Sequence, residues 1–187
     1  MPPCEPSTLD PETLAETCLG LSGMFTYPQH ALPDLKFLGS GPFDGDQPPP
    51  FPSLESLQVE YTRLFINTLP EVPCPPYGSI YLEGCCMSGS TVSIQAIYRR
   101  AGIESDEMPD HFAVEMEFLG LLLPCLSNGT PEQRSDAVEI IQHLSAWTPE
   151  FFNRVEEHDR SGFYRHAAGI GKKTINPLND FAARARQ

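Results

Sequence analysis

The chain has 187 residues, of which 40% are hydrophobic and 20% charged, so it can fill the core of one compact domain and is not a disordered polyelectrolyte. Lys and Arg number 12 against 25 Asp and Glu, which gives a formal net charge of −13. This charge argues against a nucleic-acid-binding protein, and it limits membrane contact to a peripheral one at most, because both surfaces are anionic. A cationic peptide or protein segment is the partner that the charge favours.

No segment has the pattern of a membrane span or of an export signal. The longest apolar run, residues 118–123, ends at Pro124 and is far shorter than the ~20 residues that a span needs. The N-terminus lacks a basic region followed by an apolar stretch. We therefore expect a cytoplasmic protein with six reduced cysteines, and we attribute the adjacent pair Cys85 and Cys86 to packing or chance rather than to a redox role.

Helical periodicity dominates the first part of the chain. Asp10 followed by Pro11 predicts the start of a helix that ends near residue 27. A flexible loop rich in Pro and Gly is expected over residues 28–52, with a short helix near 35–38, and Ser53 predicts the cap of a second helix over residues 54–65. Residues 67–86, rich in proline and aromatics, are predicted to form another loop.

Five more helices are expected after this loop. They cover residues 87–101, a segment from 110 to 123 that Asp110 would cap, a segment from 131 to 147 with a capping box at Thr130, a helix that starts at Thr148-Pro149, and a short helix over 161–170. No alternating strand pattern is found. The predicted fold is all-α: a single-domain bundle of about seven helices over residues 1–171, followed by a basic tail over residues 172–187 that folds back on the acidic body.

Enzyme signatures are mostly absent. Residues 169–174 have the composition of a phosphate-binding loop, but the Walker pattern needs a glycine at the position of His166. The five histidines form no ligand cluster, so we expect no metal, no cofactor and no enzymatic activity, although a Cys–His nucleophile pair remains open because its members need only meet in space.

Two segments carry the functional signal. In the first, an amphipathic helix over residues 60–65 leads into a loop in which prolines hold Tyr77 and Tyr81, rings with a polar tip that suit a partly wet binding groove. In the second, Asp110 is followed by His111, with Glu115 one turn further along the same face. Between residues 101 and 133 there are seven acids and no Lys or Arg, which indicates either a solvated face or a docking surface for arginines.

These two segments resemble the TorD/DmsD/NarJ family of redox-enzyme maturation chaperones. The match rests on the order and spacing of two motifs, residues 60–65 with 76–81 and residues 109–118. Many family members have Gly-Pro after the Leu-Phe pair, where this chain has Ile66, Asn67 and Thr68.

The resemblance implies an all-helical cytoplasmic chaperone that binds the twin-arginine signal peptide of a molybdenum-cofactor oxidoreductase precursor, assists cofactor insertion and delays export. It implies a peptide-binding site made of Glu60, Tyr61, Leu64, Phe65, Pro76, Tyr77, Ser79, Tyr81, Asp110, His111 and Glu115. Two alternatives remain open: a permanent adaptor subunit of a redox complex, and a nucleotide-binding enzyme. A homodimer formed by helix exchange about the 28–52 loop is a further hypothesis.

Overall fold

The structure is a computed structural model that describes residues 10–30, 52–127 and 129–185. In these residues, seven α-helices and two short helical segments form a bundle, and the one β-bridge is isolated, so the all-α prediction is confirmed. None of the described helices is long and apolar enough to cross a membrane. The expected helix near 35–38 and most of the 28–52 loop lie outside the described residues.

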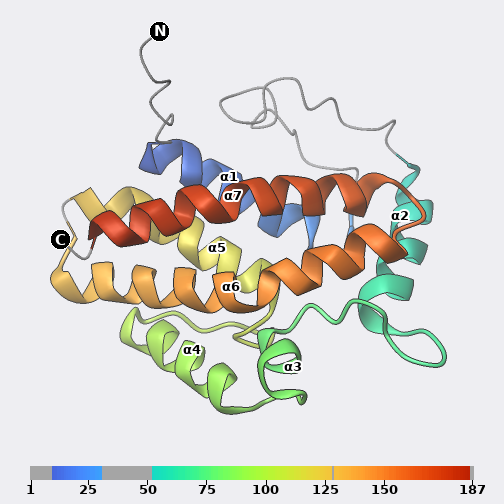
Figure 1. Ribbon diagram of the computed structural model, residues 1–187, viewed down its shortest axis with the longest axis horizontal. Helices are drawn as coiled ribbons and strands as arrows, with labels where there is room; N and C mark the ends of the chain where they lie inside the picture. Colours follow the sequence, from blue (N-terminus) through green and yellow to red (C-terminus); the bar gives the residue numbers. More distant parts are fainter. Residues whose placement is uncertain (1–9, 31–51, 128, 186–187) are drawn as a thin grey trace, which may run out of the picture.

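Two long antiparallel helices, α6 (Pro131–His158) and α7 (Phe163–Ala185), lie side by side along the molecule (Figure 1). The N-terminal helix α1 (Pro11–Met24) packs against α7 and also against α5 (Phe112–Leu122), which itself contacts α6. Helix α5 is therefore the central element, enclosed by α1 and α6.

Shorter elements cover the end and the other side of α6. Helix α2 (Leu54–Tyr61) continues into a π-helical turn, η3 (Thr62–Ile66), at one end of the molecule (Figure 1). Helices α3 (Gly78–Glu83) and α4 (Gly89–Arg100) pack on α6, and a 3₁₀ turn, η4 (Leu123–Ser127), follows α5.

The caps predicted for α1 and α6 from their sequences are present in the structure. Asp10 accepts hydrogen bonds from the backbone amides of Glu12 and Thr13, both at 3.0 Å. Thr130 and Gln133 form the capping box that opens α6. These local interactions satisfy amides that the helix itself leaves without acceptors, so the sequence alone locates the starts of α1 and α6.

Seven helices were expected and seven are described, but they are not the same seven. Helix α3 lies within residues 67–86, where a loop was predicted. The helix expected to begin at Pro149 is instead the second half of α6, and α7 runs on through Gly171 to Ala185, so residues 172–185 continue a helix rather than form a tail. Lys172 does pair with an acidic side chain of the body, Glu156, at 2.6 Å.

Packing explains why Pro149 does not end α6. A proline inside a helix removes one backbone hydrogen bond. The side chains on either side of it, Trp147 and Phe151, are both buried in the same core. A break at Pro149 would pull one of these rings out of the core, so the burial of both favours a continuous helix.

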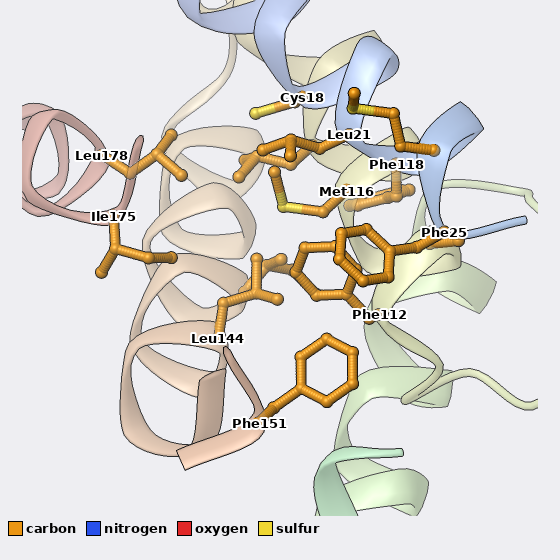
Figure 2. Close-up of a cluster of buried hydrophobic side chains, with 14 of the residues drawn as sticks. Cys18, Leu21, Phe25, Phe112, Met116, Phe118, Leu144, Phe151, Ile175 and Leu178 are labelled. Carbon is orange, nitrogen blue, oxygen red and sulfur yellow. The ribbon is translucent and has the colours of Figure 1, made fainter. Parts of the chain in front are cut away.

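The core is organised around Phe25, which follows the last turn of α1. Its ring lies 4.9 Å from that of Phe112 on α5 and 5.5 Å from that of Phe151 on α6, and Figure 2 shows these three rings converging. It also lies 5.8 Å from the ring of Phe65 on η3. Because one aromatic cluster touches four elements, the π-helical turn that bears Phe65 is fixed to the rigid centre of the bundle.

The contact between α6 and α7 leads to a matched pair of predictions. A Cβ atom at Gly171 would lie 2.3 Å from Cζ of Phe152, whereas a Cβ at Gly169 in the same helix would meet nothing within 4 Å. We expect Gly171→Ala to lower the free energy of unfolding by about 1–3 kcal/mol, because the buried ring must move. Gly169→Ala should leave it unchanged or raise it by up to about 1 kcal/mol through helix propensity. Urea unfolding of both variants checks this, and equal effects would contradict it.

Candidate functional site

Two segments far apart in the sequence are joined by backbone pairing. Tyr77 and His111 form an isolated antiparallel bridge, in which the carbonyl of Pro76 accepts a hydrogen bond from the amide of Phe112 at 2.8 Å. The rings of Tyr77 and His111 meet edge to face, with centroids 5.2 Å apart. The two motifs singled out in the sequence therefore form one site.

His111 caps helix α5. Its Nδ1 atom accepts a hydrogen bond from the amide of Ala113 at 3.1 Å, so the prediction that Asp110 caps this helix is wrong. Burial lowers the pKa of His111, more than the nearby charges of Glu107 and Asp110 raise it. A neutral ring has the lone pair on Nδ1 that capping requires.

Asp110 points into the protein and caps a different helix. Its side chain is completely buried, and Oδ2 accepts a hydrogen bond from the amide of Ser79 at 2.8 Å, at the start of α3. The backbone carbonyl of Asp110 also accepts from the amide of Gly78 at 2.9 Å. No local side chain caps α3, so this helix could not be predicted from its own residues.

Glu115 is also buried, and its partner comes from α6. Its Oε2 lies 2.7 Å from Nδ1 of His143, and a Cβ atom at Gly78 would lie 2.6 Å from Cε1 of the same His143 ring. Burial raises the pKa of Glu115 to about 7, against the lowering effect of His143. Burial lowers the pKa of His143, but the hydrogen bond and charge of Glu115 outweigh it, so the pKa of His143 is raised. The expected exposed His111–Glu115 face is therefore replaced by an internal Glu115–His143 pair.

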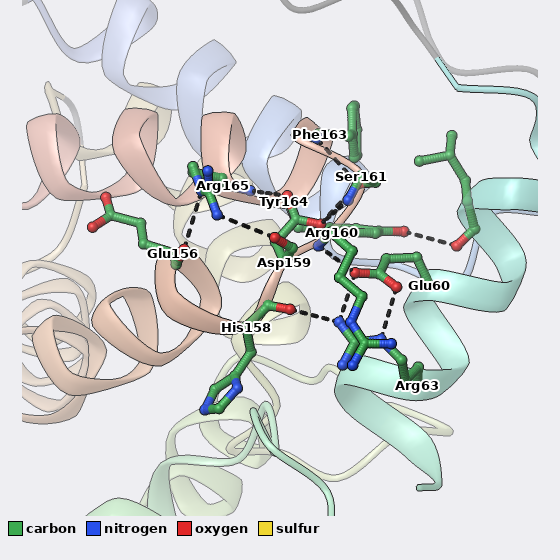
Figure 3. Close-up of polar contacts among 11 residues, drawn as sticks. Glu60, Arg63, Glu156, His158, Asp159, Arg160, Ser161, Phe163, Tyr164 and Arg165 are labelled. Atoms are coloured by element: carbon green, nitrogen blue, oxygen red, sulfur yellow. Dashed lines mark hydrogen bonds and ion pairs between the residues drawn. The ribbon is translucent and has the colours of Figure 1, made fainter.

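Glu60 joins the α2–η3 segment to the turn between α6 and α7 (Figure 3). Its carboxylate accepts two hydrogen bonds from Arg63, at 2.8 and 2.7 Å, and one from the amide of Arg160 at 2.7 Å. Arg63 also donates to the carbonyl of His158 at 2.6 Å. The carboxylate oxygens of Glu60 are thus occupied by hydrogen bonds within the protein, so Glu60 has a structural role.

Three further predicted residues, Leu64, Ser79 and Tyr81, line none of the hollows found among the described residues. Leu64 and Ser79 are completely buried. Tyr81 stacks on Trp147 with ring centroids 5.4 Å apart, and the guanidinium carbon of Arg154 lies over the Tyr81 ring, 5.2 Å from its centre.

The remaining predicted residues line one cleft of about 390 Å³, which we name the Tyr77 cleft. It lies between the end of α1, η3, the loop before α3, residues 105–107 and α5. Of the eleven residues implied by the resemblance, it brings together Tyr61, Phe65, Pro76, Tyr77 and His111. It does not include Glu60, Leu64, Ser79, Tyr81, Asp110 or Glu115.

The charge of the Tyr77 cleft is one-sided. Asp106, Glu107 and Glu117 line it, and no Lys or Arg of the described chain does so. All three acids are exposed. The cleft therefore combines aromatic and aliphatic walls with a carboxylate rim, an arrangement suited to a ligand that is both cationic and apolar.

Several cleft residues were missed or only partly noticed in the sequence. Tyr27 and Ile66 stand next to predicted helix ends, where the pattern gives no direction for a side chain. Glu117 was noticed only as one member of an acidic stretch. A usable signal existed, because Val114 and Glu117 are three residues apart and so share one face of α5.

The family model described as the nitrate reductase delta subunit matches residues 51–153, which is more than half of the chain and includes every segment around the Tyr77 cleft except the end of α1. The chain belongs to this family. The resemblance to redox-enzyme maturation chaperones is confirmed, and the relatives that match are named chaperones rather than enzymes, in agreement with the expectation of a non-enzymatic protein.

Individual family relatives agree with this assignment. The chaperone protein TorD of Escherichia coli O81 (strain ED1a) is 31% identical over 115 residues, which cover 58% of this chain and 54% of the relative. The chaperone protein YcdY of Escherichia coli K12 is 26% identical over 130 residues, 68% of this chain and 65% of the relative. The chain thus spans little more than half the length of the TorD relative.

A solved structure from Archaeoglobus fulgidus, described as that of a candidate redox enzyme maturation protein, is similar over almost the whole fold. It is 27% identical, covers 94% of this chain and 99% of its own, and superposes with a TM-score of 0.56. The helical bundle is therefore shared beyond the segment that the family model matches.

Proposed function

We propose that this chain is a maturation chaperone for a molybdenum-cofactor oxidoreductase, and that the Tyr77 cleft binds the twin-arginine leader of the precursor. The observation that carries the proposal is the composition of the cleft: aromatic walls, three exposed carboxylates and no basic lining residue of the described chain. A leader of this class joins a cationic segment to an apolar stretch, so its two parts match the two kinds of surface.

The proposed mechanism is reversible binding without covalent chemistry. Tyr61 and Phe65 form the fixed floor, because both are almost completely buried in the core. Tyr77 is only half-buried and is held by the bridge to His111, so it can contact a ligand at little entropic cost. A precursor whose leader lies in the cleft is kept from export while its cofactor is inserted, and it is released when the leader dissociates.

Calorimetry with a synthetic leader tests the proposal. The probe is a peptide with an Arg-Arg pair followed by an apolar stretch of about 15 residues. We expect replacement of both arginines by alanine to weaken binding about tenfold or more, since the carboxylate rim then loses its partners. We also expect the affinity to fall when salt rises from about 50 mM to about 300 mM, because exposed charges are screened.

The control keeps the charge and changes the shape. A peptide with two lysines in place of the arginines should bind with intermediate affinity, because lysine cannot make the bidentate contact. Equal affinity for the arginine, lysine and alanine peptides would contradict the proposed recognition. Stable co-purification with the mature, cofactor-loaded enzyme would instead favour a permanent adaptor subunit.

A further inference from the structure

Helix α5 is buried on every side except one narrow stripe. Eight of its 11 residues are buried, including Glu115 and Gly120. The more accessible positions on it include Val114, Glu117 and Leu121, which follow one another at spacings of three and four and so form one face. This face of a central helix is open to solvent and carries one acidic side chain between two apolar ones. Core packing does not explain why apolar side chains are exposed there.

This stripe borders three hollows in the surface. Glu117 lines the Tyr77 cleft, a small hollow of about 290 Å³ and a larger one of about 660 Å³. The small hollow has apolar walls that include Tyr98, Ile103 and Phe118, and the larger one lies between the end of α1 and the start of α7. No Lys or Arg of the described residues lines any of the three. Glu117 therefore stands where the three hollows meet.

The carboxylate of Glu117 is better prepared to bind a ligand than that of its neighbour Glu107. An Oε1 atom of Glu107 accepts a hydrogen bond from the amide of Met108 at 2.9 Å, and Glu107 lies in the loop before α5. Glu117, in contrast, has no ion pair or side-chain hydrogen bond within the described part of the chain. It also projects from a helix whose other sides are fixed in the core, so little entropy is lost when a ligand pairs with it.

We propose that Glu117 determines the specificity of the site: it pairs with one arginine of the bound leader, while a single large apolar side chain beside that arginine fills the small hollow. This inference rests on the proposed leader binding. The small hollow is smaller than a ligand pocket of ordinary size, which suits one side chain rather than a segment. A guanidinium can bind a carboxylate through two parallel hydrogen bonds, so Glu117 discriminates arginine from lysine at that position.

A double-mutant cycle tests this assignment. Binding of the twin-arginine peptide is measured for the full chain and for Glu117→Gln, each with the intact peptide and with peptides in which one arginine at a time is replaced by glutamine. We expect Glu117→Gln to weaken the intact peptide about tenfold. For one of the two arginines, the replacement should lower the affinity of the wild type about tenfold. It should hardly change the affinity of Glu117→Gln, because that variant has already lost the ion pair with this arginine.

Two controls accompany the cycle. Glu157→Gln removes an exposed acid of α6 that lines none of the three hollows, and it should change the affinity less than twofold apart from general charge effects. An alanine scan of the peptide should find one apolar position next to the arginine pair at which alanine weakens binding to the wild type, and this effect should shrink when Ile103→Trp, at a residue that lines the small hollow and not the Tyr77 cleft, fills that hollow.

The outcomes separate the two levels of the proposal. If the wild type binds the leader and Glu117→Gln binds it equally well, or if the effects of Glu117→Gln and of each arginine replacement simply add, the assignment of Glu117 is overturned and leader binding stands. If the wild type binds no leader, both the proposed function and this inference fail.

Discussion

Replacing Asp110 with alanine is expected to lower the free energy of unfolding by about 2–3 kcal/mol and to weaken leader binding, although the Asp110 side chain is completely buried. Its Oδ2 atom is the acceptor for the amide of Ser79, and the alanine variant leaves that amide buried without a partner. The first turn of α3 then loosens. Tyr77 immediately precedes this turn, so the wall of the cleft loses its support.

Asp110→Asn is the matched control. Asparagine keeps an oxygen that can accept from the Ser79 amide, so most of the stability should remain. If Asp110 positions the cleft, the asparagine variant should also retain most of the leader affinity. If instead its carboxylate pairs directly with an arginine of the leader, Asn and Ala should reduce the affinity equally, and this outcome would contradict the positioning role. Urea unfolding and calorimetry on the two variants distinguish the cases.

Local signals were sufficient for elements that carry their own caps and faces. Asp10 and Thr130 open α1 and α6 through bonds within a few residues, and such bonds are visible in a sequence. Helix α3 was invisible because its cap, Asp110, comes from another part of the chain. In the same way, Pro149 gave a strong local signal for a helix start, and burial of the rings on both sides outweighed it.

For the site, the sequence predicted which segments meet but not which of their side chains face the cleft. The two motifs identified the segments that meet, because family resemblance and aromatic loops both pointed to them. They could not show which side chains face the cleft. Asp110 and Glu115 are acidic residues in a very acidic stretch, and an exposed rim was the simplest interpretation. Only the contact of Asp110 with the start of α3 and the packing of α6 against α5 turn these two residues inward, while Glu117 remains exposed.

The second large expected effect is a pH dependence of stability, which arises from the buried Glu115–His143 pair. Burial raises the pKa of Glu115 from its ordinary value of 4.5 to about 7, and the pKa of His143 is raised as well. The charge of Asp110 favours protonation of both groups, and Glu83 favours protonation of His143. The folded state thus binds protons that the unfolded chain has already released. The stability that this pair contributes is greatest at pH values below the pKa values of these groups in the unfolded chain, and it declines as the pH rises through their pKa values in the folded state.

Other groups act in the opposite direction. Burial lowers the pKa of His111, so its contribution is present above the unfolded pKa and is lost as pH falls. The carboxyl pKa values of Glu60 and Glu83 are lowered in the fold, and their contributions are lost only in more acidic solution. The Glu115 effect is therefore isolated by comparing two variants that share all these groups, rather than by the pH profile of one protein.

Glu115→Gln provides that comparison, because glutamine keeps the volume and a hydrogen bond to His143 but does not titrate. Between about pH 5 and about pH 8, we expect the wild type to lose about 2–3 kcal/mol more than the variant in urea unfolding, since one pKa unit corresponds to about 1.4 kcal/mol. Parallel pH profiles would show that the proton is not held at this pair. Because the His143 ring also lies against Gly78, next to Tyr77, loss of that proton should loosen the same wall of the cleft, and leader binding should weaken with pH in the wild type more than in the variant.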